Sequence, residues 1–579
     1  RGLPAAPRRV QTSPESSTES LLMPKRRSAV IIPLEHPQSQ RGKIRQEATA
    51  KAVSGDASKK GKKLRSMKRS SVFEDVQDNA HASLTDENNG GAAGHCALDA
   101  HGCSDDARSM HHDIEGEDGL ASDTMKADNS LLRLHHEGWV AETGCEILNQ
   151  PDRSDKAARM FAWLVAPASV QAFDNEVRER RPMYIARSVR EYYDGWLGST
   201  EIKQLLSEQK LKWTEEIDVT NYVNGKRQTL NAEGVATASE VLPALERGCS
   251  LRLSWPQRQS PALAGLLSTL EEHFCCGAGC NAYLTPSSNQ GFAPHYDDVD
   301  VFVLQVEGAK EWRVYPPPSA EDVLPFTSSV DFDETQIGEP MEVLTLRPGD
   351  LLYLPRGYVH QAKTVSVGTP SLHLTISISR RHTYRDLIEL AVRGAIDAAA
   401  AMNAEWRRAL PRDYLSFTGA VYSDRTNDSR RVAFEATVAR MLGALVSNVP
   451  LDAACDQFAC SNFMHERLPP HTAPADAKRL SPPNLTLKSA VRLRSRHAAR
   501  LCIEDEVAVL YHHVENTTIY RELPEPAHVD FAMEAVPALD QILTSFPKYV
   551  IVGNLPLETD DQKLDVAAAL VEAKLLLVK

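Results

Sequence analysis

The chain has 579 residues, of which 42% are hydrophobic, and its 65 Lys and Arg against 78 Asp and Glu give a formal net charge of −13. This length is enough for two or three domains with large buried cores. No apolar segment opens the chain, no run of about 20 apolar residues occurs, and ten cysteines are too sparse for a disulfide scaffold. We therefore expect a soluble intracellular protein with reduced thiols, neither secreted nor inserted in a membrane.

The first 135 residues predict a disordered tail whose charge is divided into two blocks. Residues 1–70 hold 17 Lys and Arg against 5 Asp and Glu, and residues 71–130 hold 2 against 14. The tail has no sustained apolar periodicity. Its clusters PKRRS, from Pro24, and KKGKKLRSMKRS, from Lys59, suit nuclear import or contact with nucleic acid. A merely solvated run of charge is the alternative.

A folded domain is expected over residues 136–384. The stretch RMFAWLVAPASVQAFDNEVRERRPMYIARS reads as two helices that lead into a strand at Met183–Arg187. We take this strand as the entry to the domain.

A histidine and an aspartate then stand two positions apart, immediately before an apolar run. His295 and Asp297 precede Val301 to Leu304, which predicts a strand buried on both faces. Side chains two positions apart on an extended chain point to the same side, so this pair can converge on one atom. The alternative is a hydrogen-bonded pair at a strand entrance.

A second histidine follows another short strand. Pro348, Gly349 and Asp350 predict a turn, Leu351 to Leu354 a strand, and His360 comes after the next break. Two histidines and one carboxylate from different strands of a barrel form the facial triad of non-haem Fe(II) oxygenases. A structural zinc site would need four ligands, whereas a catalytic zinc on these three residues stays open.

Lys310 is the candidate partner of an anionic ligand. It follows the turn Glu307-Gly308-Ala309 and begins the return strand EWRVY, which we expect to pair with the strand after Asp297. A lysine pointing into the barrel would be a buried unpaired charge unless an anion met it. A lysine that points out of the hairpin tip is the alternative.

Two further stretches alternate between polar and apolar residues. In SLHLTISIS, from Ser371, one face is apolar and the other carries His373, Thr375 and Ser377. NAYLTP places Asn281, Tyr283 and Thr285 on one face in the same way. These polar faces either line the barrel interior or face water.

These residues resemble the JmjC-type ribosomal oxygenases, and most closely their nucleolar branch of lysyl demethylases and histidyl hydroxylases. The resemblance covers about three quarters of the chain, from about Phe161 onward. It is carried by CSLRLSWPQ, NAYLTPSSNQGFAPHYDDVDVFVLQVEGAKEWRVYPP, PGDLLYLPRGYVHQA and SLHLTIS, and later by LDAACDQFACSNFMHERLPP and VGNLPLETDDQ.

The resemblance implies an α+β protein built on a double-stranded β-helix, the cupin or jelly-roll barrel of JmjC domains, that binds Fe(II) and uses 2-oxoglutarate as cosubstrate. It also implies nuclear and nucleolar localisation. By this resemblance His295, Asp297 and His360 are the iron ligands, and Lys310 binds the distal 2-oxoglutarate carboxylate. Asn281 and Thr375 are expected near the cosubstrate. The residues expected to hold the substrate segment are Arg252, Tyr283 and Ser377.

After the barrel, apolar residues recur at the spacing of an α-helix, within residues 387–395 and again within 434–445. The resemblance implies a helical dimerisation domain over residues 385–458 and a winged-helix domain over residues 459–579. Residues 461–579 hold 13 Lys and Arg against 16 Asp and Glu. This net negative charge argues against direct DNA binding by the last domain.

The expected enzyme is therefore a 2-oxoglutarate-dependent dioxygenase that hydroxylates a histidine of a ribosomal protein. Tyr283 and Ser377 are neutral hydrogen-bonding residues suited to an imidazole, whereas a trimethylammonium group favours an aromatic cage. Demethylation of methyl-lysine on histone H3 at the same site ranks second. A catalytically silent nuclear cupin that acts only as a binding module is the alternative of another class.

Overall fold

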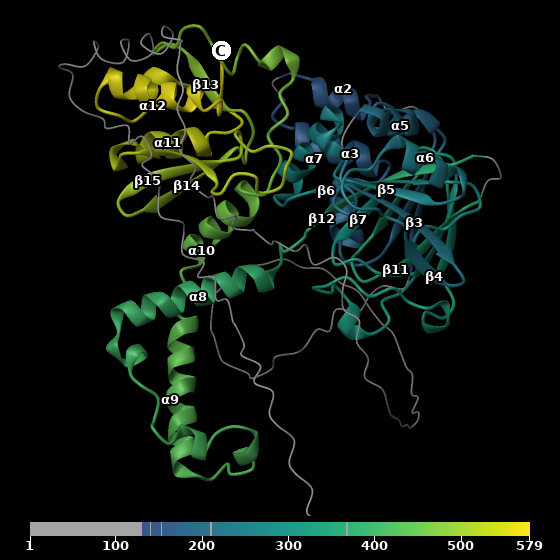
Figure 1. The fold of residues 1–579 in the computed structure, drawn as a ribbon. Coiled ribbons are helices and arrows are strands. Elements are labelled where there is room, and N and C mark those ends of the chain that lie inside the picture. The colour runs from purple at the N-terminus through teal and green to yellow at the C-terminus, as the bar shows by residue number, and fades with distance from the viewer. Residues whose placement is uncertain (1–129, 139–140, 152, 209–210, 366–368) are drawn as a thin grey trace, which may run out of the picture.

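The computed structural model describes residues 130–138, 141–151, 153–208, 211–365 and 369–579. Figure 1 shows three parts: a β-rich domain, an arm of helices that extends away from it, and a smaller α/β domain that contains the C-terminus. The tail expected over residues 1–135, with both basic clusters, lies outside the described residues except for its last six residues.

Two sheets build the β-rich domain. The larger has nine strands in the order β1-β2-β10-β7-β12-β6-β5-β3-β4, and the smaller has the order β11-β8-β9. All neighbours are antiparallel except β1 and β2. The strands are β1 Leu132–His136, β2 Met183–Arg187, β3 Ile217–Val223, β4 Lys226–Thr229, β5 Ser250–Ser254, β6 Gly279–Thr285, β7 Asp300–Glu307, β8 Lys310–Tyr315, β9 Glu342–Leu346, β10 Leu351–Leu354, β11 Val359–Thr364 and β12 Ser371–Ile378.

The two sheets pack face to face, because one buried apolar cluster contains side chains from both. Val303 of β7 and Leu352 of β10 share this cluster with Trp312 of β8 and Leu344 of β9. Alternate residues such as Phe302 point to the opposite face of the large sheet, into the main core. The expected strand buried on both faces and the expected double-stranded β-helix are therefore confirmed.

Helices cover the outer face of the large sheet (Figure 1). The longest is α7, which begins where Ser260 accepts a hydrogen bond from the Leu263 amide and Pro261 takes the first helical position. Its Leu266 and Leu270 pack in the same core as Phe161 of α3. The helices of this domain are α2 Gly144–Asn149, α3 Lys156–Val165, α4 Val170–Ala172, α5 Ser199–Glu208, α6 Ala238–Glu246 and α7 Pro261–Phe274.

Two expectations about strands are wrong. Lys310 begins β8, but β8 pairs with β11 and β9 of the small sheet and not with β7. The chain turns at Gly308, at φ 65°, with no room for a side chain because a Cβ there would lie 2.2 Å from the Pro370 carbonyl oxygen. Residues 132–135 belong to strand β1 and not to the tail, because Leu132 and Leu134 pack against the core and the strand pairs with β2.

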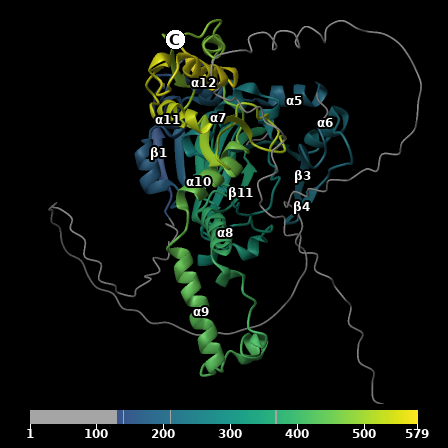
Figure 2. The ribbon, with the colours of Figure 1, turned by 90° about the vertical axis from the view of Figure 1, so that its left-hand side faces the viewer.

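The helical arm consists of α8 Tyr384–Met402, α9 Ser429–Val446 and α10 Leu451–Phe458. In Figures 1 and 2, α9 extends downward, away from both other parts of the molecule. Of its apolar residues only Leu445 is buried. The expected helices at 387–395 and 434–445 are present, and most of the surface of the second helix is exposed to solvent.

The C-terminal domain combines two small sheets with two helices. Its sheet orders are β17-β13-β18 and β14-β15-β16. Its elements are β13 Ala490–Leu493, β14 Ala499–Glu504, β15 Val507–His512, β16 Ala527–Phe531, α11 Val536–Thr544, β17 Val550–Ile551, α12 Asp560–Glu572 and β18 Leu576–Val578.

A buried ion pair joins this domain to the barrel domain. Arg467 donates to the Glu272 carboxylate of α7 over 2.8 Å, and its side chain is only 1% exposed. The neighbouring Glu271 accepts a hydrogen bond of 2.8 Å from the Leu468 amide. The C-terminal domain is thus held against the helix that covers the large sheet.

Within the described residues, no single helix has the length and apolarity to cross a membrane. One bent pair of helices, Ser429–Val446 with Leu451–Met464, meets those two criteria together.

Candidate active site

Three side chains that could bind a metal meet in the barrel domain. His295 and Asp297 lie in the segment before β7, and His360 is the second residue of β11. One nitrogen or oxygen atom from each residue lies within 4.8 Å of the other two. Asp297 approaches both histidines, with one carboxylate oxygen 4.0 Å from His295 Nε2 and the other 3.7 Å from His360 Nε2.

The backbone fixes the two histidines directly opposite each other. The His295 amide donates to the His360 carbonyl over 3.2 Å, and the His360 amide donates back over 2.9 Å. This reciprocal pair is the hydrogen-bonded unit of an antiparallel ladder. The relative position of the two imidazoles is therefore set by main-chain bonds that connect the ligand segment to the small sheet.

Each imidazole is also oriented by a carbonyl two residues earlier in the chain. His295 Nδ1 lies 2.8 Å from the Ala293 oxygen, and His360 Nδ1 lies 3.1 Å from the Tyr358 oxygen. Nδ1 carries the proton that each carbonyl accepts, so Nε2 keeps its lone pair for a metal. Burial, with the neighbouring His295, lowers the pKa of His360 to about 4 and keeps that ring neutral.

Lys310 is buried in the same barrel and is 4% exposed. Its ammonium donates to the Thr285 hydroxyl of β6 over 3.0 Å. Burial lowers the pKa of Lys310 to about 7. No carboxylate among the described residues pairs with it, so the site lacks the anion that would restore its full charge.

The polar faces of β6 and β12 point into the barrel. Thr375 lies directly opposite Asn281, and His373 opposite Tyr283, in the antiparallel register of the two strands. The His373 ring stacks on Tyr283 with centroids 4.9 Å apart and meets Trp312 edge-on at 5.3 Å. These polar faces line the interior, and the apolar faces of the same strands pack in the main core.

Known proteins share this architecture. Residues 252–387 match the JmjC domain, and residues 469–579 match the C-terminal winged-helix domain of ribosomal oxygenase 1. The bifunctional lysine-specific demethylase and histidyl-hydroxylase NO66 of Dictyostelium discoideum is 40% identical over 444 residues, which are 76% of this chain and 86% of that protein. The chain belongs to the JmjC-domain ribosomal oxygenases.

Ribosomal oxygenase 1 of Rattus norvegicus is 38% identical over 449 residues, 75% of this chain and 74% of that protein. The ribosomal oxygenase YcfD of Escherichia coli, solved with cobalt and 2-oxoglutarate, covers 71% of this chain and 99% of its own, at 16% identity and a TM-score of 0.41. As a JmjC ribosomal oxygenase, the protein is an Fe(II)- and 2-oxoglutarate-dependent enzyme, and its expected winged-helix domain is confirmed.

The residues present fit both the metal and the cosubstrate of this family. Two imidazoles and one carboxylate would leave open positions on a bound iron, as the facial triad requires. His373 Nδ1 is buried and has no hydrogen-bond partner among the described residues, and Lys310 has no carboxylate. A bound dianion between the triad and Lys310 would satisfy groups that are otherwise costly to bury.

The three expected substrate residues of the ribosomal oxygenase lie on adjacent strands. Arg252 of β5 is opposite Tyr283 of β6, and its guanidinium pairs with Asp218 of β3, donating from Nε over 2.7 Å. Ser377 of β12 is opposite Gly279, where a side chain would meet the serine hydroxyl at 2.8 Å. Arg252 is therefore oriented by a carboxylate that the sequence did not single out.

Three residues of the site were missed or only partly recognised from the sequence. Thr285 shares a strand face with Asn281 and Tyr283, so its direction was predictable, but its bond to Lys310 was not. His373 appeared only as one of several polar residues on its strand. Trp312, whose ring lies 5.9 Å from His360, gave no signal beyond a buried aromatic residue.

Proposed function

We propose that this oxygenase hydroxylates a histidine side chain of a ribosomal protein. The observation that carries the proposal is the convergence of His295, Asp297 and His360 in a barrel that also buries Lys310. The family relationship supplies the reaction class, and the pocket lining supplies the preference for an imidazole.

In this proposal the chain's own residues perform three tasks. His295, Asp297 and His360 hold Fe(II) through Nε2, a carboxylate oxygen and Nε2, and the Ala293 and Tyr358 carbonyls keep both rings in the binding tautomer. When bound, iron and 2-oxoglutarate supply the oxygen-dependent chemistry that oxidises a C–H bond of the substrate. The protein positions that bond.

Lys310 is proposed to bind the distal carboxylate of 2-oxoglutarate, with Thr285 orienting its ammonium over 3.0 Å. Binding an anion favours the protonated amine and so reverses the effect of burial on its pKa. Asn281 and Thr375, which face each other across β6 and β12, would complete the cosubstrate surroundings. These residues would hold the cosubstrate in place.

The walls of the pocket favour a neutral imidazole as the target. Tyr283 is covered on one ring face by His373 and met edge-on by Phe292 at 5.4 Å, so its hydroxyl is its available polar group. Ser377 adds a second hydroxyl on the neighbouring strand. A quaternary ammonium would instead favour open ring faces arranged as a cage.

Methyl-lysine demethylation of histone H3 is the second candidate. The name of the Dictyostelium relative gives that protein both activities. One oxidation chemistry serves both outcomes, because a hydroxylated carbon is stable on a histidine, whereas a hydroxylated N-methyl group breaks down and leaves the lysine. The occupant of the pocket decides between them.

Mass spectrometry of ribosomal proteins and histones tests the ranking. Cells with wild-type enzyme should carry one added oxygen atom on a ribosomal-protein histidine, and a His360→Ala strain should lack it. Histone methyl-lysine levels should differ little between the strains. Accumulation of methylated histone H3 in the variant, without a change in histidine oxidation, would place demethylation first.

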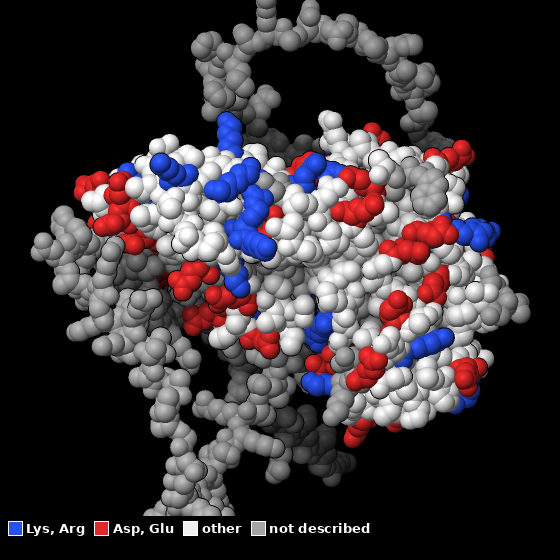
Figure 3. Space-filling model, turned by 90° about the horizontal axis from the view of Figure 1, so that it is seen from above, with Lys and Arg blue, Asp and Glu red and all other residues white. Residues whose placement is uncertain are grey.

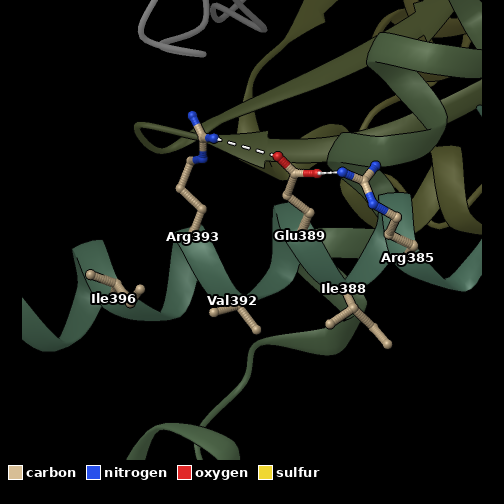
Figure 4. Close-up of a pocket in the computed structure, with 6 residues that line it drawn as sticks. All are labelled: Arg385, Ile388, Glu389, Val392, Arg393 and Ile396. Atoms are coloured by element: carbon tan, nitrogen blue, oxygen red, sulfur yellow. Dashed lines mark ion pairs between the residues drawn. The ribbon is translucent and has the colours of Figure 1, made fainter. Parts of the chain in front are cut away.

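We also propose that the arm forms a homodimer. In Figure 4, Ile388, Val392 and Ile396 project from one side of α8, and Arg385, Glu389 and Arg393 lie on the other side with ion pairs of 3.5 and 3.8 Å. On α9, Leu442 and Val446 are 55% and 75% exposed. Exposed apolar surface on two adjacent helices is characteristic of a protein interface.

Light scattering tests the dimer. Ile388→Glu should yield monomers, because a carboxylate cannot be buried unpaired in an apolar interface. Ile503→Glu is the matched control, since Ile503 of β14 is 52% exposed and Ile388 is 55% exposed. Loss of the dimer in both variants, or in neither, would contradict the assignment to the arm.

Nuclear and nucleolar localisation is proposed on the basic clusters near Pro24 and Lys59. Replacing the lysines and arginines of both clusters with glutamine should leave a fluorescent fusion in the cytoplasm. Nucleolar accumulation of this variant would contradict the proposal.

A further inference from the structure

Two cysteine thiols face each other where the helical arm meets the C-terminal domain. Cys460 lies in η9, the helical turn Ala459–Met464 that directly follows α10, and Cys502 lies in β14. Their Sγ atoms are 3.4 Å apart. All eight cysteines of the described residues are free, and among them only these two are joined thiol to thiol.

Two parallel connections hold α10 and η9 against β14. Arg500 of β14 donates to the Asp456 carboxylate of α10 over 2.6 Å. Cys460 follows Asp456 by four positions, which is about 6 Å along a helix. Cys502 follows Arg500 by two positions, which is about 7 Å along a strand. Both spacings keep side chains on one face, so the ion pair sets the register that brings the two thiols together.

The thiol pair is enclosed by apolar side chains. Phe463, Met464 and Val509 belong to the same buried cluster. Cys460 is 1% exposed and Cys502 is 8% exposed. The hydrogen bond with Cys502, together with burial, raises the pKa of the Cys460 thiol and keeps it protonated at neutral pH. The closed structure therefore protects the pair, and a reaction requires η9 to move away from β14.

The contact that covers the thiols is one that can open locally. β14 is the edge strand of its sheet, and α10 and η9 pack against it. The side chains of Arg500 and Asp456 are 47% and 31% exposed, and ion pairs in solvent are weak. Local opening at such a contact needs much less free energy than global unfolding. Cys502, the more exposed of the two cysteines, would meet a reagent first.

We propose that Cys460 and Cys502 form a reversible disulfide that locks the end of the arm to the C-terminal domain. The two sulfur atoms need only a small approach to reach bonding distance. In a reducing compartment such a bond is transient and reports oxidation, because the thiol form is restored when the oxidant is removed.

A small-molecule disulfide, glutathione disulfide, is the oxidant of the proposed reaction. The Cys502 thiolate attacks one of its sulfur atoms, which gives a mixed disulfide and releases one glutathione. The Cys460 thiolate then attacks the Cys502 sulfur and displaces the second glutathione. Two protein thiols are oxidised to one disulfide, one glutathione disulfide is reduced to two thiols, and the two protons end on the released glutathione.

Proximity, and not surface charge, selects this pair among the described thiols. A cysteine without a second thiol in reach forms only a mixed disulfide, which reduced glutathione reverses. A large basic area would attract the anionic oxidant to the cysteines near it. On the face seen from above in Figure 3, however, side chains of both signs occur on the half formed by the C-terminal domain and on the half formed by the barrel domain.

The lock would restrain the arm. In Figure 1, α10 lies between α8 and the strands of the C-terminal domain. The His382 ring, just before α8, lies 5.4 Å from the Phe458 ring at the end of α10. A bond at Cys460 would therefore fix the helix on which α8 rests. This inference is independent of which residue the enzyme oxidises and of whether the arm forms a dimer.

Peptide mapping after anaerobic incubation of the full chain with glutathione disulfide tests the proposal. Anaerobic conditions exclude the oxygen-dependent chemistry of the metal site. After alkylation of the free thiols and digestion without reduction, the wild type should yield a peptide pair linked through Cys460 and Cys502. Cys502→Ala should not yield it. Cys455→Ala is the matched control, because Cys455 is a half-buried thiol of α10, and it should yield the linked pair.

The absence of this linked pair from the wild type, with or without glutathione on either cysteine, would overturn the proposal. Equal amounts of links to Cys455 or Cys275 would also overturn it. Hydrogen exchange of the wild type tests the lock and needs no variant. Oxidation should slow exchange of the η9 and β14 amides about tenfold or more, reversibly with dithiothreitol, and leave the α9 amides unchanged. Equal exchange in both forms would overturn the lock.

Discussion

The barrel interior and the helical arm both present groups that no other described residue satisfies, but their physical settings are opposite. In the barrel, Lys310 is 4% exposed and lies among polar side chains that a ligand must satisfy. On the arm, the apolar residues Leu442 and Val446 of α9 are 55% and 75% exposed. A buried charge is costly without its specific partner, whereas exposed apolar surface is stabilised by burial against another surface and needs no single partner atom.

This difference also explains how visible each region is in the sequence. The barrel site depends on short spacings, such as His295 to Asp297, and on strand ends that a β-helix brings together. The arm repeats apolar residues at helical spacing, which predicts a helix but not whether its apolar side faces the core or solvent. Chemistry that needs convergence leaves a local motif, whereas the exposure of a helix depends on which elements pack against it.

The largest expected effect is the loss of oxidation when a triad member is removed. Asp297→Ala should reduce product formation to the uncatalysed background and abolish stoichiometric Fe(II) binding, because two imidazoles alone cannot complete the facial triad. The fold should remain, since the Asp297 side chain is 29% exposed and lies outside the apolar clusters of the described residues.

Asp298→Ala is the control for that variant. The neighbouring carboxylate accepts a hydrogen bond from Ser328 over 2.7 Å and belongs to no metal-binding group in the described chain. Iron content by elemental analysis should be normal in Asp298→Ala. Equal loss of iron in both variants would argue against the assignment of Asp297.

Removing the buried cation should weaken cosubstrate binding. Truncating one partner of a buried charge pair costs about 2–5 kcal/mol, so Lys310→Ala should raise the 2-oxoglutarate dissociation constant by about 30-fold to several thousandfold. Calorimetry with Lys363→Ala, an exposed lysine of β11, provides the comparison. An unchanged dissociation constant in Lys310→Ala would mean that another group binds the carboxylate.

Loss of Arg467 should destabilise the junction between the barrel domain and the C-terminal domain. Arg467→Ala removes the cation that pairs with Glu272, which keeps its hydrogen bonds from the Ser495 hydroxyl and the His497 amide. Denaturant titration should show a loss of about 3–5 kcal/mol of unfolding free energy. Arg500→Ala, which removes the exposed pair with Asp456, should cost about 0–1 kcal/mol. Similar costs for both variants would mean that Glu272 and Arg467 do not hold the domains together.

The smallest effect concerns pH. Because burial lowers the pKa of Lys310 to about 7, the amine is charged below that pH and must take up a proton to bind an anion above it. The 2-oxoglutarate affinity should therefore fall by up to about tenfold per pH unit above pH 7 and be flat below it. Lys310→Arg, which stays charged, should flatten the profile. A flat profile in the wild type would contradict the predicted role of burial.

Much of the fold followed from alternation and turn residues, and the failures have physical causes. The strands at Leu351–Leu354 and Ser371–Ile378 were readable because their faces differ in polarity or their ends carry turns. The pairing of β8 could not be predicted, because a tight turn at Gly308 does not determine whether the following strand stays in the same sheet. Strand β1 was missed because its polar residues hide two half-buried leucines.

Of the site residues, the sequence predicted only those whose chemistry limits the residue types that can be used. The convergence of His295, Asp297 and His360 was predictable because metal chemistry limits the possible ligands. The burial of Lys310 was predictable from its place in the barrel, and its role stays a prediction. Side chains that act through another residue were missed, as with Asp218 on Arg252, since their roles depend on the register of β3 with β5.

Anaerobic titration of Fe(II) with 2-oxoglutarate tests the central claim most directly. The wild type should develop the weak visible charge-transfer band of iron chelated by the cosubstrate. Asp297→Ala should not develop it, and Lys310→Ala should need far more 2-oxoglutarate to reach it. An equal band at equal 2-oxoglutarate in all three proteins, or no band in the wild type, would contradict an iron and cosubstrate site at these residues.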